Sequence, residues 1–192
     1  MRKVILLLTA LGCAGCGEGL RQHIVDPARM PAMKRIALLP IENVSEQKDA
    51  GTKVTHIFMV EMFRAGIFSL PDMGEVEHAM AGAQIRAISE VDQVALLKLS
   101  DSLKVAGILM GTVLEYQMLR KGRVEIPAVA ISARLLDAKT GEIVWVGNNF
   151  RKGDDKETLF GMGRESSFGR LAQETVSELV LSLKSGVGGT PK

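Results

Sequence analysis

Three long strand-like segments in the second half of the chain limit its fold more than any other feature. They cover residues 105–118, 124–137 and 142–151. Residues 119–123 join the first two, and the turn 138–141 joins the last two. Connections this short join antiparallel neighbours, because a parallel crossover needs a dozen or more residues. The sequence therefore predicts three consecutive antiparallel strands.

Helical patterns surround these strands. Short apolar runs ended by proline predict two strands at 35–39 and 67–70, and a polar loop is expected at 42–49. Apolar periodicity predicts helices over 50–65, 75–86, from a capping box at 89–92 to 103, and 165–183. The order β-α-β-α-α-β-β-β-α predicts an α/β fold, with a mixed sheet of about five strands flanked by helices in one domain over 34–184.

The first residues have the anatomy of a bacterial lipoprotein signal. Arg2 and Lys3 precede an apolar run at 4–11, and residues 1–15 are expected to be removed. Cys16 follows Ala-Gly and is the expected lipid attachment site; Cys13, which follows Leu-Gly, is the alternative. An ordinary cleaved signal and an uncleaved anchor helix are the other interpretations. Gly17, in place of the Asp that resembles an inner-membrane retention signal, favours the outer membrane.

The two ends of the mature chain are expected to lie outside the fold. Residues 16–33 are interpreted as the lipidated N-terminus and a flexible tether, in which residues 17–33 reach at most about 55–60 Å. The Gly- and Pro-containing residues 185–192 are predicted to form a disordered tail.

Charge and aromatic content exclude nucleic acid as a partner. Without Arg2 and Lys3 the chain has 22 basic and 22 acidic residues, so it has no electrostatic attraction for phosphates. Aromatic residues make up 4% of the chain, too few for a platform on which bases or sugars stack.

The residues that could carry chemistry are few and scattered. His23, His56 and His78 have no second ligand at local spacing, and both cysteines lie in the signal region, so neither a metal nor a cofactor is expected. Ser166 and Ser167 lie in a glycine-rich stretch that lacks a phosphate-loop motif, and the chain has no G-x-S-x-G elbow. No catalytic residue is therefore predicted; a hydrolase that uses one of these serines with His78 and an acid is the rival hypothesis.

Two further features have a structural interpretation. Asp154 and Asp155 stand among basic residues, which favours a solvated surface loop over a calcium site. Trp145 stands at strand spacing, which favours packing in the core over a membrane anchor.

Four phrases in order resemble outer-membrane lipoproteins of the curli-secretion type (CsgG). The same folding unit is similar to those of the polymer-export lipoprotein PelC, the penicillin-binding-protein activator LpoB and the N-terminal domain of TolB. The matching phrases are RIALLPIENVS at 35–45, FRAGIF at 63–68, AGILMGTVLEY at 106–116 and ARLLDAKTGEIVW at 133–145.

The resemblance implies an α/β sandwich without catalytic residues that serves as an assembly or scaffold part of the cell envelope, often in rings. The chain has no spare amphipathic segments for the membrane-spanning hairpins of the curli channel. The expected function is thus a non-enzymatic accessory role in secretion, polymer export or cell-wall synthesis. The expected partners are the outer membrane, through the lipid, other envelope proteins and further copies of the chain. A module that binds a small ligand or peptidoglycan is the alternative.

Overall fold

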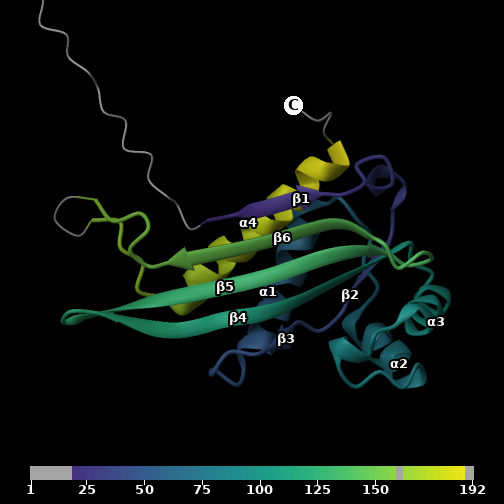
Figure 1. Cartoon of the computed structure of the whole chain (residues 1–192), viewed down its shortest axis with the longest axis horizontal. Coiled ribbons are helices and arrows are strands. Elements are labelled where there is room, and N and C mark those ends of the chain that lie inside the picture. The colour runs from purple at the N-terminus through teal and green to yellow at the C-terminus, as the bar shows by residue number, and fades with distance from the viewer. Residues whose placement is uncertain (1–18, 159–161, 189–192) are drawn as a thin grey trace, which may run out of the picture.

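A mixed sheet of six strands forms the centre of the computed structural model, which describes residues 19–158 and 162–188 (Figure 1). The strands lie in the order β1-β6-β5-β4-β2, and β3 also pairs with β4. Their bounds are β1 Arg21–Ile24, β2 Ile36–Leu38, β3 Glu42–Asn43, β4 Gly107–Lys121, β5 Val124–Asp137 and β6 Ile143–Lys152. The predicted α/β class and mixed sheet are confirmed.

The three long strands pair as the short connections predict. β4 and β5 are antiparallel along their whole length, from the pair Gly107–Asp137 to the pair Lys121–Val124, and β6 is antiparallel to β5. Gly122 (φ 64°) and Gly141 (φ 73°) occupy the two turns. Glycine suits both positions because a side chain disfavours positive φ.

The first half of the sheet differs from the prediction in two details. β2 and β3 both pair in parallel with β4, so the expected loop at 42–49 begins with a two-residue strand. The expected strand at 67–70 is reduced to a single bridge between Ser69 and Arg35. Pro71 has no backbone N–H, so the chain cannot extend this pairing further.

The predicted tether is wrong for residues 21–33, which belong to the folded body. Arg21–Ile24 forms β1 at the edge of the sheet, antiparallel to β6 and in register with Asn148 to Trp145. Met30, in the following 3-10 turn, is fully buried. Residues 21–24 do not alternate between apolar and polar side chains, so no local pattern predicts a strand. The segment is a strand because its backbone pairs with β6.

Four helices cover the sheet: α1 Ala50–Ala65, α2 Met73–Gly82, α3 Gln93–Leu103 and α4 Phe168–Gly188. α1 and α4 pack on one face, with one hydrophobic cluster, while α2 and α3 cover part of the other face beside β2, with a second cluster (Figure 1). Leu109 and Ile108 show the division, because adjacent residues of β4 enter different clusters. Within the described residues, no helix covers much of the second face of β5 and β6 (Figure 1).

Each predicted helix is present, but the ends of α2, α3 and α4 differ from the prediction. α1 has the predicted bounds, and Gly66 ends it in the left-handed region (φ 62°) with its N–H bonded to Met62 O. Asp92 is the N-cap of α3 and accepts from Ala95 N at 2.8 Å, so the predicted capping box lies too early.

α4 corrects the tail that was predicted at 185–192. The helix continues to Gly188, and Gly186 lies so close to Met30 that an added Cβ would stand 2.9 Å from its sulfur. The residues after Gly188 lie outside the described part of the chain. Among the described residues, no helix combines the length and the apolar character needed to cross a bilayer.

Trp145 is a core residue, as predicted. Its side chain is fully buried among the sheet, α1 and α4, and its indole Nε1 donates to Ser182 Oγ at 3.3 Å. Burial of an aromatic side chain with its one donor satisfied is the arrangement expected of a packing tryptophan.

Candidate interaction surfaces

The three histidines lie on three different elements. His23 is on β1, His56 on α1 and His78 on α2, and all three are exposed. Within the described part of the chain, no group of three His, Cys, Asp or Glu side chains could hold a metal ion.

The residues of the rival hydrolase are not brought together. Ser166 and Ser167 are exposed in the segment before α4, and Ser167 Oγ accepts from Arg170 N at 3.4 Å, as a helix-capping hydroxyl does. His78 lines a hollow beside Arg35 and Glu75, whose lining contains neither serine. A nucleophile and its base must lie within hydrogen-bond reach, so these residues do not form a catalytic pair.

Asp155 lies in an exposed turn, as predicted, whereas Asp154 is largely covered and paired. Lys121 Nζ donates to Asp154 Oδ2 at 2.8 Å, and Lys152 N donates to Asp155 Oδ2 at 2.8 Å. The Asp154 side chain is only 12% exposed. The hydrogen bond from Lys121 holds the pKa of the Asp154 carboxyl below its ordinary value. Asp154 thus joins the segment after β6 to the end of the β4–β5 hairpin, whereas Asp155 closes the turn at the end of β6.

A buried polar network joins β6 to α4. Asn149 Nδ2 donates to Thr175 O at 3.0 Å and to Glu178 Oε2 at 2.9 Å, and Arg151 Nη2 donates to Glu178 Oε1 at 2.5 Å. Asn149 is fully buried. The sequence analysis missed this network because its partners stand 26 to 29 residues apart and face each other only after α4 packs on the sheet.

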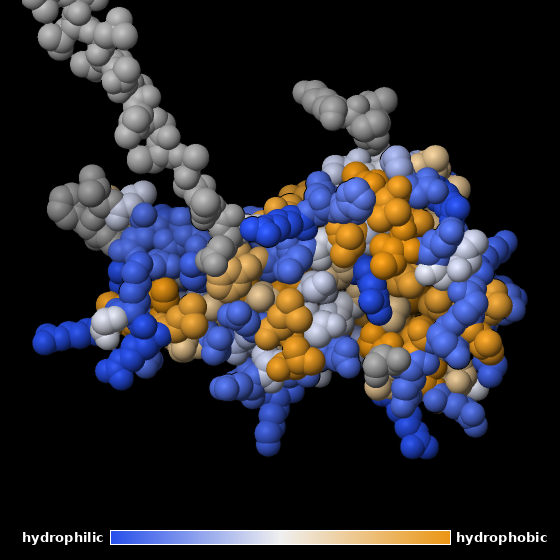
Figure 2. Space-filling model, viewed as in Figure 1, coloured by the Kyte–Doolittle hydropathy of each residue, from blue (hydrophilic) through white to orange (hydrophobic). Residues whose placement is uncertain are grey.

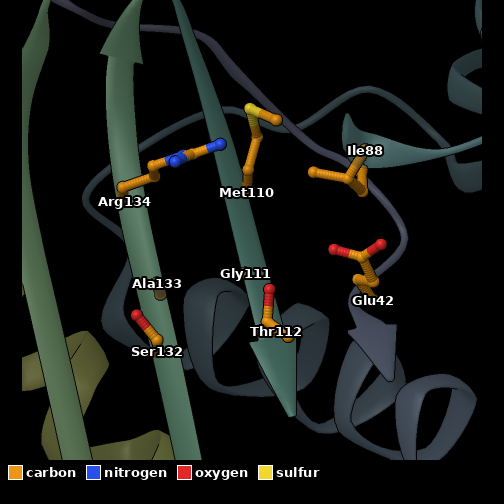
Figure 3. Close-up of a pocket in the computed structure, with 8 residues that line it drawn as sticks. All are labelled: Glu42, Ile88, Met110, Gly111, Thr112, Ser132, Ala133 and Arg134. Atoms are coloured by element: carbon orange, nitrogen blue, oxygen red, sulfur yellow. The ribbon is translucent and has the colours of Figure 1, made fainter. Parts of the chain in front are cut away.

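A hollow of about 260 Å³ opens on the partly uncovered face of the sheet (Figure 3). A cross-strand row forms its floor: Glu42 of β3 pairs with Thr112 of β4, which pairs with Ser132 of β5. Arg134 and Met110 form the next row on the same face, and Ile88 lies at the side of the hollow.

The polar side chains of the hollow have no partners within the described residues. Glu42, Thr112, Ser132 and Arg134 make no side-chain hydrogen bond or ion pair there. In Figure 3 the Arg134 guanidinium and the Glu42 carboxylate lie on opposite sides of the β4 ribbon. A molecule bound in the hollow would therefore meet the Arg134 guanidinium on one side and the Glu42 carboxylate on the other. The hydroxyls of Ser132 and Thr112 lie between them. The sequence analysis singled out none of these residues, since they meet only through strand register.

A second feature lies on α1. Val60 and Phe63 are 55% and 61% exposed, while Glu61 between them is 4% exposed. Glu61 accepts from Arg64 Nη1 at 2.9 Å and from Gln173 Nε2 of α4 at 3.3 Å. The centre of a protein contact surface is more apolar than its rim and enriched in aromatic residues, which suits exposed side chains such as Val60 and Phe63.

Solved structures of bacterial proteins share this fold. PelC from Paraburkholderia phytofirmans, a dodecamer, matches with a TM-score of 0.57 and 20% identity over 86% of this chain and 95% of that chain. Lipoprotein GNA1162 from Neisseria meningitidis matches with a TM-score of 0.56 and 19% identity over 77% of this chain and 98% of that one. The hypothetical protein CT253 from Chlamydia trachomatis matches with a TM-score of 0.54 and 10% identity, over 82% and 99% of the two chains.

No protein-family model matches the chain, and no curated protein matches it. At these identities the likeness is one of fold. It covers most of this chain and nearly all of each matched chain, so the folded body is a whole unit of that architecture. The chain shares its fold with lipoprotein GNA1162 and with PelC.

Proposed function

We propose that this protein is a lipid-anchored, non-enzymatic accessory component of the bacterial cell envelope that acts through contacts with other envelope proteins. The fold that it shares with lipoprotein GNA1162 and with PelC carries the proposal. The cysteine motif ahead of the fold supports an acyl anchor at Cys16, with Cys13 as the alternative. The anchor faces the periplasm from the outer membrane, and the contacts serve secretion, polymer export or cell-wall synthesis.

The anchor is tested by metabolic labelling with a fatty acid. We expect label in the wild-type protein and in Cys13→Ser, and loss of label together with release from the membrane fraction in Cys16→Ser. Two or three acyl chains anchor stably, whereas one gives marginal binding, so the loss should be complete. A Cys13→Ser/Cys16→Ser variant that still partitions entirely into membranes would contradict the proposal.

Assembly into rings is the second part of the proposal. PelC, whose fold this chain shares, is a dodecamer. The exposed apolar residues Val60 and Phe63 of α1 would suit contacts between protein chains. Analytical ultracentrifugation of the detergent-extracted protein should show species heavier than one mature chain. A single monomeric species at all concentrations would contradict the ring.

The hollow on the sheet face favours a second candidate function, the binding of a small ligand. Its cation, hydroxyls and anion suit a short peptide that carries a carboxylate at one end and an ammonium group at the other, as peptidoglycan stem peptides do. Calorimetric titration with a purified stem peptide should give heat of binding that Arg134→Gln and Glu42→Gln each abolish. Lys139→Gln, at the distant β5–β6 turn, is the control and should bind as the wild type does. Equal heats from all four proteins would reject this function.

A further inference from the structure

One cross-strand row extends the floor of the hollow across the sheet to β1. Ser132 of β5, which lines the hollow, pairs with Asn148 of β6, and Asn148 pairs with Arg21 of β1. Residues that stand directly opposite each other on paired strands point to the same face of a sheet. Arg21 and Asn148 therefore share the uncovered face with Ser132.

The next row, two residues along each strand, adds two basic side chains to this face. His23 of β1 pairs with Val146 of β6, and Val146 pairs with Arg134 of β5. The pairing of β6 with both neighbours is regular over these two rows. His23 and Arg134 are thus diagonal neighbours of Asn148, and such neighbours stand about 7–8 Å apart on one face.

Asn148 stands at the centre of a group of hydrogen-bond donors. Arg21 and Ser132 lie directly opposite it, at the cross-strand Cα separation of about 5 Å, and the two basic residues of the second row lie diagonally. Each of these side chains carries a donor, and the two arginines are permanently charged. The five residues are called the donor cluster below: Arg21, His23, Ser132, Arg134 and Asn148.

The donor cluster is not engaged within the described part of the chain. None of its side chains makes a hydrogen bond or an ion pair there. Four of the five residues are exposed, and Ser132 is half-buried. In the first row the nearest carboxylate is that of Glu42, two strands beyond Ser132. Figure 2, which views the molecule from this face, shows hydrophilic side chains over β1 and on the sheet beside it, among hydrophobic ones. The positive charge of the cluster is therefore not compensated within its two rows.

Arg134 belongs to both the hollow and the donor cluster. In Figure 3 its guanidinium lies over β4, on the side of the hollow. No side-chain partner among the described residues holds it there. A change of rotamer brings it over β6 instead, and such changes are common when a ligand binds. The hollow and the cluster can thus share Arg134, whereas Arg21 and His23 belong to the cluster alone.

The composition of the donor cluster suits a phosphate group. An arginine fork binds phosphate through two parallel hydrogen bonds, and the amide, hydroxyl and imidazole add further donors. A phosphate monoester offers three acceptor oxygens and up to two negative charges, so it can use more of these donors than a carboxylate can. The balanced net charge of the chain does not exclude the site, because the cluster forms only through the register of three strands.

The donor cluster also lies close to the proposed acyl anchor. Arg21 is five residues after Cys16, and a fully extended chain of that length spans at most about 18 Å. If Cys16 carries the acyl chains, the phosphate of a lipid headgroup is within reach of the cluster. A soluble phosphate ester reaches the same exposed face from the solvent.

We propose that the donor cluster binds a phosphate group on the uncovered face of the sheet. The phosphate belongs either to a lipid headgroup beside the anchor or to a soluble phosphate ester. The site goes beyond the proposed function, since it needs neither a bound stem peptide nor the acylation of Cys16. The acylation bears only on the lipid source.

Nuclear magnetic resonance of the mature, acylated protein tests the site. The isotopically labelled protein is held in maltoside micelles, which carry no phosphate, and is titrated with glycerol phosphate at constant ionic strength. We expect saturable shifts of the Asn148 side-chain amide and of the Nε–H signals of Arg21 and Arg134. Acetate is the reference for a carboxylate. Equal shifts at equal concentrations of acetate would overturn the assignment to phosphate.

Substitutions identify the groups responsible. Arg21→Gln and Arg134→Gln should each weaken the binding of glycerol phosphate about tenfold, the effect of losing a hydrogen bond between charged groups. Arg120→Gln/Arg123→Gln, at the β4–β5 turn, removes two exposed arginines that also lack side-chain partners among the described residues. This control should bind as the wild type does. An equal loss in the control would show that overall charge attracts the ligand, and it would overturn the site.

Two variants separate the donor cluster from the hollow. Glu42→Gln should abolish the binding of the stem peptide and should not weaken the binding of glycerol phosphate. Arg21→Gln should weaken the binding of glycerol phosphate and leave that of the stem peptide unchanged. Unchanged phosphate binding in Arg21→Gln would overturn the donor cluster and leave the peptide function standing.

Nanodiscs identify the source of the phosphate. If a headgroup fills the site, discs of phosphatidylglycerol should place the Asn148 amide signal at its phosphate-bound position without added ligand. Discs of a galactolipid, which has no phosphate, should leave the signal at its free position. A soluble ester as ligand predicts a free signal in both discs and a shift in both on titration. A signal that stays free in both discs at saturating glycerol phosphate overturns the proposal, whereas protein that does not enter the discs contradicts the anchor alone.

Discussion

Lys121 Nζ donates a hydrogen bond to Asp154 Oδ2 at 2.8 Å and so ties the β4–β5 hairpin to the segment that follows β6. The lysine is at the projecting end of the sheet and is 75% exposed, whereas the aspartate is largely covered. Together with the hydrogen bond from Gly153 N to Pro127 O at 2.8 Å, this pair joins the hairpin to the segment that leads to α4.

The first prediction concerns this pair. Asp154→Asn should lower the free energy of unfolding by about 0.5 kcal/mol at neutral pH, since one partner is exposed and water screens the attraction. Urea unfolding followed by circular dichroism measures the change. Lys139→Gln, which removes an unpaired lysine, should cause none.

The pH dependence of the pair has a definite sign. Lys121 lowers the pKa of Asp154 in the folded protein, so the pair contributes stability above the unfolded pKa of about 3.9 and loses it as the pH falls through the lower folded value. The difference between wild type and Asp154→Asn should therefore shrink below about pH 4. A difference that grows on acidification would contradict the assignment.

The second prediction tests whether residues before 34 belong to the fold. Met30 is fully buried, so Met30→Ala should lower the free energy of unfolding by about 2–5 kcal/mol. Val25→Ala, at a side chain that is 51% exposed in the same segment, should cost less than about 1 kcal/mol. Similar small effects for both variants would mean that this segment does not pack on the body.

The third prediction concerns Trp145 and its hydrogen-bond partner. Trp145→Ala should cost about 3–5 kcal/mol because it opens a large cavity in the main core. Ser182→Ala should cost about 1–2 kcal/mol, because the buried indole N–H loses its acceptor and Gln22 of β1 loses a donor. Thermal and urea unfolding measure both changes. A Ser182→Ala variant as unstable as Trp145→Ala would show that the hydroxyl does more than make these two hydrogen bonds.

The fourth prediction concerns the link between β6 and α4. Glu178→Ala should lower the free energy of unfolding by about 1–3 kcal/mol, because it removes the acceptor shared by the buried Asn149 amide and Arg151. Glu174→Ala, one turn earlier on α4 and paired with the exposed Lys156, is the matched control and should cost about 1 kcal/mol or less. Equal losses would indicate that helix propensity, and not the network, sets the cost.

Periodicity and short connections determined most of the architecture. The apolar spacing of residues 50–65 gave a helix with the observed bounds of α1, and the turns at Gly122 and Gly141 made β4, β5 and β6 antiparallel neighbours. These signals are local, because each depends on residues within one or two turns of a helix or across one tight turn. The packing of Trp145 followed from strand spacing for the same reason.

Tertiary structure alone decided the features that need a distant partner. Residues 21–24 form β1 only because β6 offers a free edge, and the last turns of α4 pack on Met30 at Gly186. The hollow of Glu42, Thr112, Ser132 and Arg134 depends on the register of three strands, which no local pattern encodes. The sequence by itself therefore determined the helices, the long strands and the cysteine motif at Cys13 and Cys16. The surfaces depended on long-range pairing, because a strand edge or a helix face meets its partner only when the chain folds.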